Sequence, residues 1–247
     1  MSHESAHRII HDVMRFHKVS ARWVPCQLTA KLKEHVDACQ ELLKHFEAEY
    51  DGFLGRIVTE DETWARNQES EQGMAPYLLT KTKKFCTQPS AGKVILTLFW
   101  DERGVILEQY MPRRKPVTSA TYADLLKNHL HPAIKSKWRG CLSTSVLLQH
   151  DSARPHTVCS TVAAIQDLSF ECLPRLPYSP NFAAIEFHVL GLLKEVMGGK
   201  SSRSNKKVQK AVHKWLHSQP KDFFSRGIHA FPKCWNTCME RYGDCIE

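Results

Sequence analysis

The spacing of hydrophobic positions changes along the chain. Apolar residues first recur every three or four positions, which predicts helices over residues 5–15 and 29–49, with Thr29 as the N-cap of the second. Shorter apolar runs follow, typical of strands, and strands then alternate with helices. The expected strands are 56–59, 93–100, 105–110, 145–149 and 170–173, and the expected later helices are 119–137, 156–167, 184–197 and the tail beyond 198. This order predicts an α/β fold with a mixed sheet flanked by helices.

Three parts of the chain fall between these elements. Residues 20–29 contain Pro25 and are expected to form a linker, and residues 101–104 form the turn between two strands. Residues 66–92 are polar and irregular, and the pattern assigns them no element.

Composition excludes several classes of protein. The 247 residues suffice for one large domain or a domain with an appendage. Apolar runs are too short to span a bilayer and the N-terminus has no signal-peptide pattern, so we expect a soluble intracellular protein without a membrane partner. The nine cysteines are odd in number and show no paired spacing, which predicts reduced thiols and no cysteine-based zinc site.

Positive charge is concentrated in the second half of the chain. The net charge is +8, and Lys and Arg outnumber Asp and Glu by 9 to 5 in residues 111–186 and by 11 to 5 in residues 187–247. A basic surface suits a polyanion bound through its phosphates. A solvated, lysine-rich helix face explains the same counts.

Three acids lie where sheet ends are expected. Asp61 follows the first strand, Asp151 follows the strand 145–149, and Glu186, after 34 intervening residues, lies in the first turns of a helix. Because α/β sheets gather ligands at strand ends, the three could hold two Mg²⁺ ions for phosphodiester chemistry. Each also has a structural explanation: a turn residue, an acceptor before the helix starting at Pro155, and a helix N-terminal acid.

The runs around these acids resemble the mariner family of DNA transposases. The similar segments, in order, are RWVP (22–25), DETW (61–64), TQPSAGKV (87–94), LLQHDSARPH (147–156), ECLPRLPYSP (171–180) and FFSRGIH (223–229). The resemblance implies an RNase H-like (retroviral-integrase-type) catalytic fold in which Asp61, Asp151 and Glu186 bind two Mg²⁺ or Mn²⁺ ions. It also implies hydrolysis of double-stranded DNA at transposon ends, then attack of the freed 3′-hydroxyl on target DNA, in the nucleus and with no small-molecule substrate.

The resemblance further implies a division of the chain. Residues 1–18 would be a remnant of a second helix-turn-helix unit, with Arg8 as a DNA contact; residues 19–50 a linker and helix; and residues 51–247 the catalytic domain. The chain is thus expected to be a truncated form. Trp23, Val24 and Pro25 fall in the linker that joins protomers, which suggests a homodimer. Arg154 and His156 are candidates for contacts to DNA or for positioning Asp151, with local packing as the alternative.

Departures from the family pattern bear on activity. Glu186 stands where mariner enzymes normally have Asp, Glu60 replaces a Gly, and Ser152 replaces an Asn. The segment before Glu186 differs as well, at residues 181, 182, 184 and 185. Two hypotheses remain: a mariner-like endonuclease and strand transferase with impaired activity, or a transposon-derived nucleic-acid-binding or interaction protein without turnover.

Overall fold

A computed structural model describes the chain over residues 28–66, 93–111, 117–138, 140, 142, 145–151, 153–174, 187–197 and 205–243. The helix expected over 5–15 and nearly all of the unassigned segment 66–92 lie outside these ranges.

The core of the fold is one five-stranded mixed sheet in the order β3-β2-β1-β4-β5. Its strands are β1 (Ile57–Arg66), β2 (Lys93–Asp101), β3 (Gly104–Tyr110), β4 (Val146–Gln149) and β5 (Phe170–Cys172). The first three strands are antiparallel neighbours, whereas β4 runs parallel to β1 and β5 parallel to β4. The predicted α/β class with a mixed sheet is confirmed.

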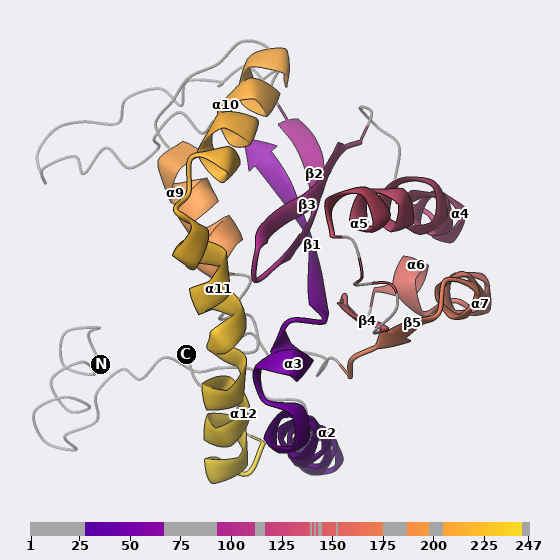
Figure 1. Cartoon of the computed structure of the whole chain (residues 1–247), viewed down its shortest axis with the longest axis vertical. Coiled ribbons are helices and arrows are strands. Elements are labelled where there is room, and N and C mark those ends of the chain that lie inside the picture. Colours follow the sequence, from indigo (N-terminus) through magenta and orange to yellow (C-terminus); the bar gives the residue numbers. More distant parts are fainter. Residues whose placement is uncertain are drawn as a thin grey trace, which may run out of the picture.

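Alternating side chains divide the apolar residues of the strands between two cores. Ile57 of β1 and Leu147 of β4 point into one core, and their neighbours Val58 and Leu148 point into the other. Successive side chains of a strand point to opposite faces, so each buried strand serves both cores. Figure 1 shows the resulting layers, with the sheet between two groups of helices.

Helices cover both faces of the sheet. One face carries α4 (Ser119–Asp124), η2 (Leu125–Leu130), α5 (His131–Lys137), α6 (Arg154–Thr157) and α7 (Cys159–Asp167). The other carries α3 (Asp51–Leu54), η4 (Phe187–Gly191), α9 (Leu192–Met197), α10 (Asn205–His217), α11 (Lys221–His229) and α12 (Phe231–Glu240). None of the described helices is long and apolar enough to cross a membrane.

The predicted helix boundaries were confirmed in part. The helix expected over 119–137 forms without a break, although its middle, η2, has π-helical hydrogen bonding, and a Thr118–Thr121 capping box starts it. The helix expected over 156–167 is instead two helices, because the extended Val158 separates α6 from α7.

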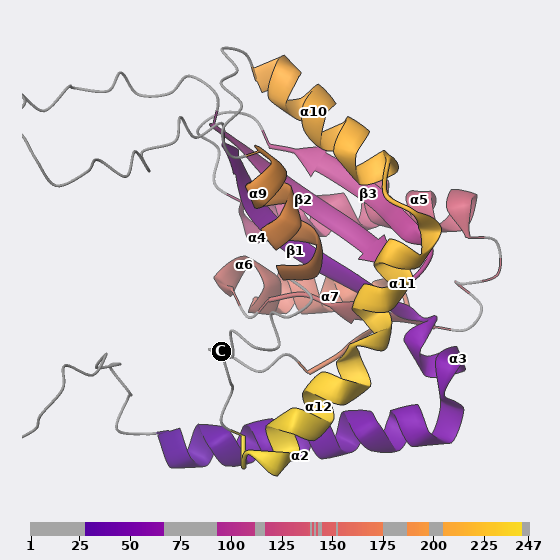
Figure 2. The same cartoon turned by 90° about the vertical axis from the view of Figure 1, so that its left-hand side faces the viewer.

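Helix α2 (Leu28–Glu49) lies across α12 at the base of the domain (Figure 2). Its buried Cys39 and Leu42 join the same core as Trp235 of α12. The backbone packs closely beyond α12: Gly243 has φ +84°, and a Cβ built on it would lie 2.2 Å from the carbonyl oxygen of Leu32. Glycine is therefore required there. Thr29 lies within α2, so its prediction as N-cap was wrong.

The β2–β3 turn contains a buried acid, Asp101, which is 2% exposed. Its Oδ1 atom accepts hydrogen bonds from the backbone N–H groups of Arg103 (2.9 Å) and Gly104 (3.1 Å). Burial outweighs these bonds and raises the pKa of Asp101 to about 6.

The wild-type protein is expected to lose stability as the pH rises from about 4 to about 6, and Asp101→Asn is expected to abolish this dependence. In that range the folded protein keeps the Asp101 proton longer than the unfolded chain, so the free energy of unfolding falls with pH, by at most about 3 kcal/mol. Asparagine can still accept both backbone hydrogen bonds. Urea unfolding of both proteins across this pH range measures the difference, and parallel curves would contradict the prediction.

Candidate active site

Asp61 and Asp151 lie the same number of residues beyond the last pair of two neighbouring parallel strands, β1 and β4. The parallel pairing of β1 and β4 ends at Thr59 and Gln149, and each acid lies two positions beyond its paired residue. Parallel neighbours in a sheet are about 4.8 Å apart, so we expect the two acids to start from adjacent points of the backbone, just beyond the last pair of β1 and β4. The structure thus brings together two of the three predicted acids.

The expectation that Asp61 follows the first strand was wrong. Strand β1 continues to Arg66, and Asp61 pairs with Leu98 of β2. The polar run from Thr59 to Thr63 resembles a turn, but its backbone completes an antiparallel ladder with β2. Asp61 therefore lies where the parallel half of the sheet ends and the antiparallel half goes on.

Asp151 is held by its own loop and by the helix that follows. Its Oδ1 atom accepts from the backbone N–H of Ala153 (3.0 Å) and contacts Nδ1 of His156. The loop geometry follows from Pro155, whose ring suits the first turn of α6. The bond to Ala153 is the structural role considered for Asp151, and the half-exposed carboxylate still faces solvent.

His156 is buried behind Asp151. It is 3% exposed, and its ring centroid lies 4.1 Å from that of Tyr122 and 5.2 Å from that of His150. Burial lowers its pKa, but the contacts with Asp151 and Glu62 and the charge of Glu60 outweigh burial and raise it to about 10. A buried ring cannot contact a DNA phosphate, so the structure favours the positioning role over the DNA contact for His156.

Tyr122 and His150 extend this buried group. The hydroxyl of Tyr122 lies 3.1 Å from Nδ1 of His150, and Nε2 of His150 lies 3.6 Å from the sulfur of Cys172. Sequence analysis missed both residues, because their contacts join strands and helices that are far apart in the sequence.

Glu60 and Glu62 point to the opposite face of β1 from Asp61, toward His156. Donor atoms of the two glutamates and of His156 all lie within 4.8 Å of one another, and Glu62 Oε1 is 3.8 Å from His156 Nε2. Sequence analysis noted Glu60 but not its direction, and missed Glu62. Strand alternation from Asp61 is the signal that finds both.

Glu60 is the most unusual of these residues, since it is 1% exposed and its Oε1 has no hydrogen-bond partner in the described part of the chain. Burial, with the charges of Glu62, Asp61 and Asp151, raises its pKa well above the usual range, although His156 acts in the opposite direction. In the folded, metal-free protein Glu60 is therefore expected to carry a proton.

Glu60→Gln is expected to stabilise the metal-free protein by about 1 to 3 kcal/mol at pH 8. The unfolded glutamate is ionised at that pH, and folding must either protonate it or bury its charge. Since the folded-state pKa is raised, this cost is small near the unfolded pKa and grows as the pH increases. Thermal unfolding at pH 5 and pH 8 tests this, with Glu41→Gln, at an exposed position of α2, as the control. A gain that does not grow with pH would count against the prediction.

Arg154 is exposed on α6, three residues from Asp151 along the chain. The remaining predicted site residues, Glu186, Arg8, Trp23, Val24 and Pro25, lie outside the described residues, as does the altered position Ser152. The described chain resumes after Glu186 at η4, and its continuation α9 packs against β1.

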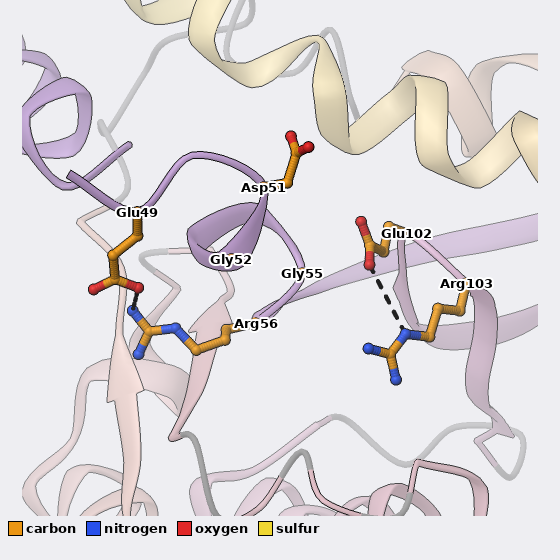
Figure 3. A pocket seen from close by; sticks show the side chains of 7 residues that line it. All are labelled: Glu49, Asp51, Gly52, Gly55, Arg56, Glu102 and Arg103. Carbon is orange, nitrogen blue, oxygen red and sulfur yellow. Dashed lines mark hydrogen bonds and ion pairs between the residues drawn. The ribbon is translucent and has the colours of Figure 1, made fainter. Parts of the chain in front are cut away.

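An open pocket of about 510 Å³ lies at the other end of β1. Its charged lining is mixed: Arg56 pairs with Glu49 at 2.8 Å, and Arg103 lies 3.8 Å from Glu102 (Figure 3). Arg56 directly precedes β1 and is five residues from Asp61, roughly 17 Å at the rise of a strand. The pocket is therefore separate from the acids.

The chain is similar to known transposases. Residues 78–144 match the family model "Transposase (partial DDE domain)". The Mariner Mos1 transposase of Drosophila mauritiana is 26% identical over all of this chain and 72% of its own length. The human histone-lysine N-methyltransferase SETMAR is also 26% identical, and the chain spans 36% of its length. The crystal structure of the Mos1 mariner paired end complex with Mn superposes with a TM-score of 0.78 at 27% identity, covering 100% of this chain and 72% of that one.

Together with the strand order and the positions of Asp61 within β1 and Asp151 just after β4, this likeness identifies an RNase H-like domain of the DDE transposase class. Within this class, the chain is a mariner-family transposase catalytic domain.

Proposed function

We propose that the chain is a metal-dependent DNA endonuclease and strand transferase that acts on transposon ends. The observation that carries the proposal is the position of Asp61 and Asp151, each two residues beyond the last pair of the parallel strands β1 and β4, in a sheet where α9 packs against β1. Glu186, directly before η4, is proposed as the third acid. The division into residues 1–18, 19–50 and 51–247, the homodimer and the nuclear location are part of the same proposal.

The residues at the sheet edge suit divalent cations with hard-oxygen preferences. Asp61 and Asp151 are carboxylates with partial exposure, and Mg²⁺ or Mn²⁺ needs few protein ligands because it retains water. When bound as a pair, such ions activate an attacking oxygen and stabilise a leaving one. Asp61, Asp151 and Glu186 would hold them, while His156 fixes the carboxylate of Asp151 through its Nδ1 contact.

DNA would be held through its phosphates by exposed basic side chains. Arg154 lies next to Asp151, and α10 carries the exposed Lys206, Lys210 and Lys214 at four-residue spacing on one face. Such contacts neutralise phosphates without reading sequence, so binding should weaken steeply with salt.

A second candidate function is DNA binding without turnover, and Glu60 is the observation that favours it. A buried acid, Glu60, stands at the position of a family glycine and lies beside His156, the residue that contacts Asp151. If this weakens the hold on Asp151, the fold and the basic surface would survive while metal-dependent cutting is lost.

Supercoiled plasmid incubated with the purified chain separates the two functions. The endonuclease predicts nicks that require Mg²⁺ or Mn²⁺ and stop with EDTA, and an Asp61→Asn/Asp151→Asn double variant controls for contaminating nuclease. A DNA end carrying a free 3′-hydroxyl should be joined to the plasmid in the same reaction. Salt-sensitive DNA binding without nicks would support the second function, and nicking that survives in the double variant would overturn the first.

A further inference from the structure

Two histidines and a glutamate meet on the sheet face that α10 covers. His213 and His217 are four residues apart on α10, and Glu108 lies on β3, the edge strand beneath (Figures 1 and 2). One donor atom from each of the three side chains lies within 4.8 Å of the other two. Histidines at this spacing project from the same side of a helix.

The carboxylate of Glu108 is already oriented. Its Oε1 atom contacts Nδ1 of His213, and its Oε2 atom lies 3.4 Å from the hydroxyl of Tyr110. The Tyr110 hydroxyl is also 3.2 Å from the carbonyl oxygen of Gln209 on α10. The hydroxyl has one proton, which it donates to one of these two acceptors at a time. Such outer hydrogen bonds fix the ligands of many protein metal sites.

We propose that Glu108, His213 and His217 form a second metal site, selective for Zn²⁺ or a similar transition-metal ion. Two imidazoles and a carboxylate are a common zinc ligand set, with water in the fourth position. Imidazole nitrogen suits Zn²⁺ and not Mg²⁺, so the site differs in preference from the carboxylates at the sheet edge. In a tetrahedral site the donors are roughly 3.4 Å apart, so small side-chain rotations close the cluster.

The register of the sheet places this site near the acids. Asp61 pairs with Leu98, and Leu98 pairs with Glu108, so the three residues form one row across β1, β2 and β3. Residues opposite each other in an antiparallel pair share a face, and two strand spacings separate Asp61 from Glu108 by roughly 10 Å. A bound ion would tie α10 to the edge strand on the face that Asp61 also uses.

The simpler alternative is a hydrogen bond between His213 and Glu108 without a metal. The exposed Lys210 and Lys214 on the same helix oppose a cation, although their ammonium groups can extend into solvent. His217 argues for the metal: it adds a third donor and lies with its ring centroid 4.3 Å from that of His213.

Zinc binding to the intact chain tests the site directly. The protein is stripped with EDTA, desalted and dialysed against micromolar Zn²⁺ with millimolar Mg²⁺ present, and bound zinc is measured by mass spectrometry. We expect His217→Ala to bind one zinc fewer per chain than wild type and to lower the affinity at least about a hundredfold. At free Zn²⁺ about a hundredfold above Kd, the wild-type Tm should rise by roughly 5 to 10 °C, and that of the variant should not.

The controls keep the test separate from nuclease activity. His129→Ala removes an exposed histidine elsewhere and should bind zinc as wild type does, and Asp61→Asn/Asp151→Asn should keep this zinc while losing nicking. Tyr110→Phe should weaken binding about tenfold without changing the stoichiometry. Because His213 and His217 are exposed, their alanine variants should fold, which circular dichroism verifies. Equal zinc in wild type and His217→Ala, or no zinc in either, overturns the proposal.

Discussion

Asp61→Asn and Asp151→Asn are expected to reduce Mg²⁺-dependent plasmid nicking by the same large factor, at least about a thousandfold, whether made singly or together. Bound metal ions supply several kcal/mol of transition-state stabilisation, and either amide weakens the shared metal site. Groups that act as one unit give non-additive losses of rate. The double variant should therefore nick plasmid as fast as the less active of the two single variants.

Asparagine is the informative substitution at these positions, because it keeps the shape of the side chain and can accept the hydrogen bond from Ala153. The variants should therefore fold like wild type. Asp167→Asn is the matched control: Asp167 is exposed on α7, pairs with Lys127 at 2.8 Å, and should not affect nicking. Losses that multiply in the double variant would show that the two acids do not share one metal centre.

His156→Ala is expected to destabilise the metal-free protein by about 3 kcal/mol and lower its Tm by roughly 6 to 12 °C. The imidazolium lies between Asp151, Glu62 and Glu60, and its removal leaves these acids without a positive partner. Breaking a buried ion pair costs about 3 to 5 kcal/mol, and the lower value applies because Asp151 and Glu62 are partly exposed.

The pH dependence of this loss has a definite sign. Because the folded-state pKa of His156 is raised to about 10, its contribution is complete below the unfolded pKa of about 6.5 and declines as the pH rises toward 10. The difference between wild type and His156→Ala should therefore shrink over that range. Denaturant unfolding at pH 6 and pH 9 measures it, with His129→Ala as a surface control. A constant difference would show that packing against Tyr122, not charge, dominates.

Local periodicity predicted the elements that carry strong patterns. The positions of the strands along the chain follow from apolar runs such as residues 93–100, whereas their order in the sheet and the two cores appear only in the structure. Asp61 was misplaced because a run of polar residues inside β1 gives the same local signal as a turn, and only pairing with β2 distinguishes them.

The side chains that surround the acids could not be predicted from local patterns, because their contacts also depend on tertiary structure. His156 meets Glu62 and Tyr122 through packing of segments far apart in the sequence. Glu108 likewise meets His213 only because the sheet register and the path of α10 bring them together. The spacing of His213 and His217 was visible in the sequence, but its third partner was not.

The contact between α2 and α12 affects how the protein can be made. Because Cys39 and Leu42 share a core with Trp235, the first described helix packs against the last one. During translation α2 leaves the ribosome long before α12 is synthesised. The apolar face of α2 therefore stays uncovered until α12, about two hundred residues later in the sequence, can pack against it. This part of the core therefore closes only after α12 has emerged, and until then the apolar face of α2 is exposed to chaperones.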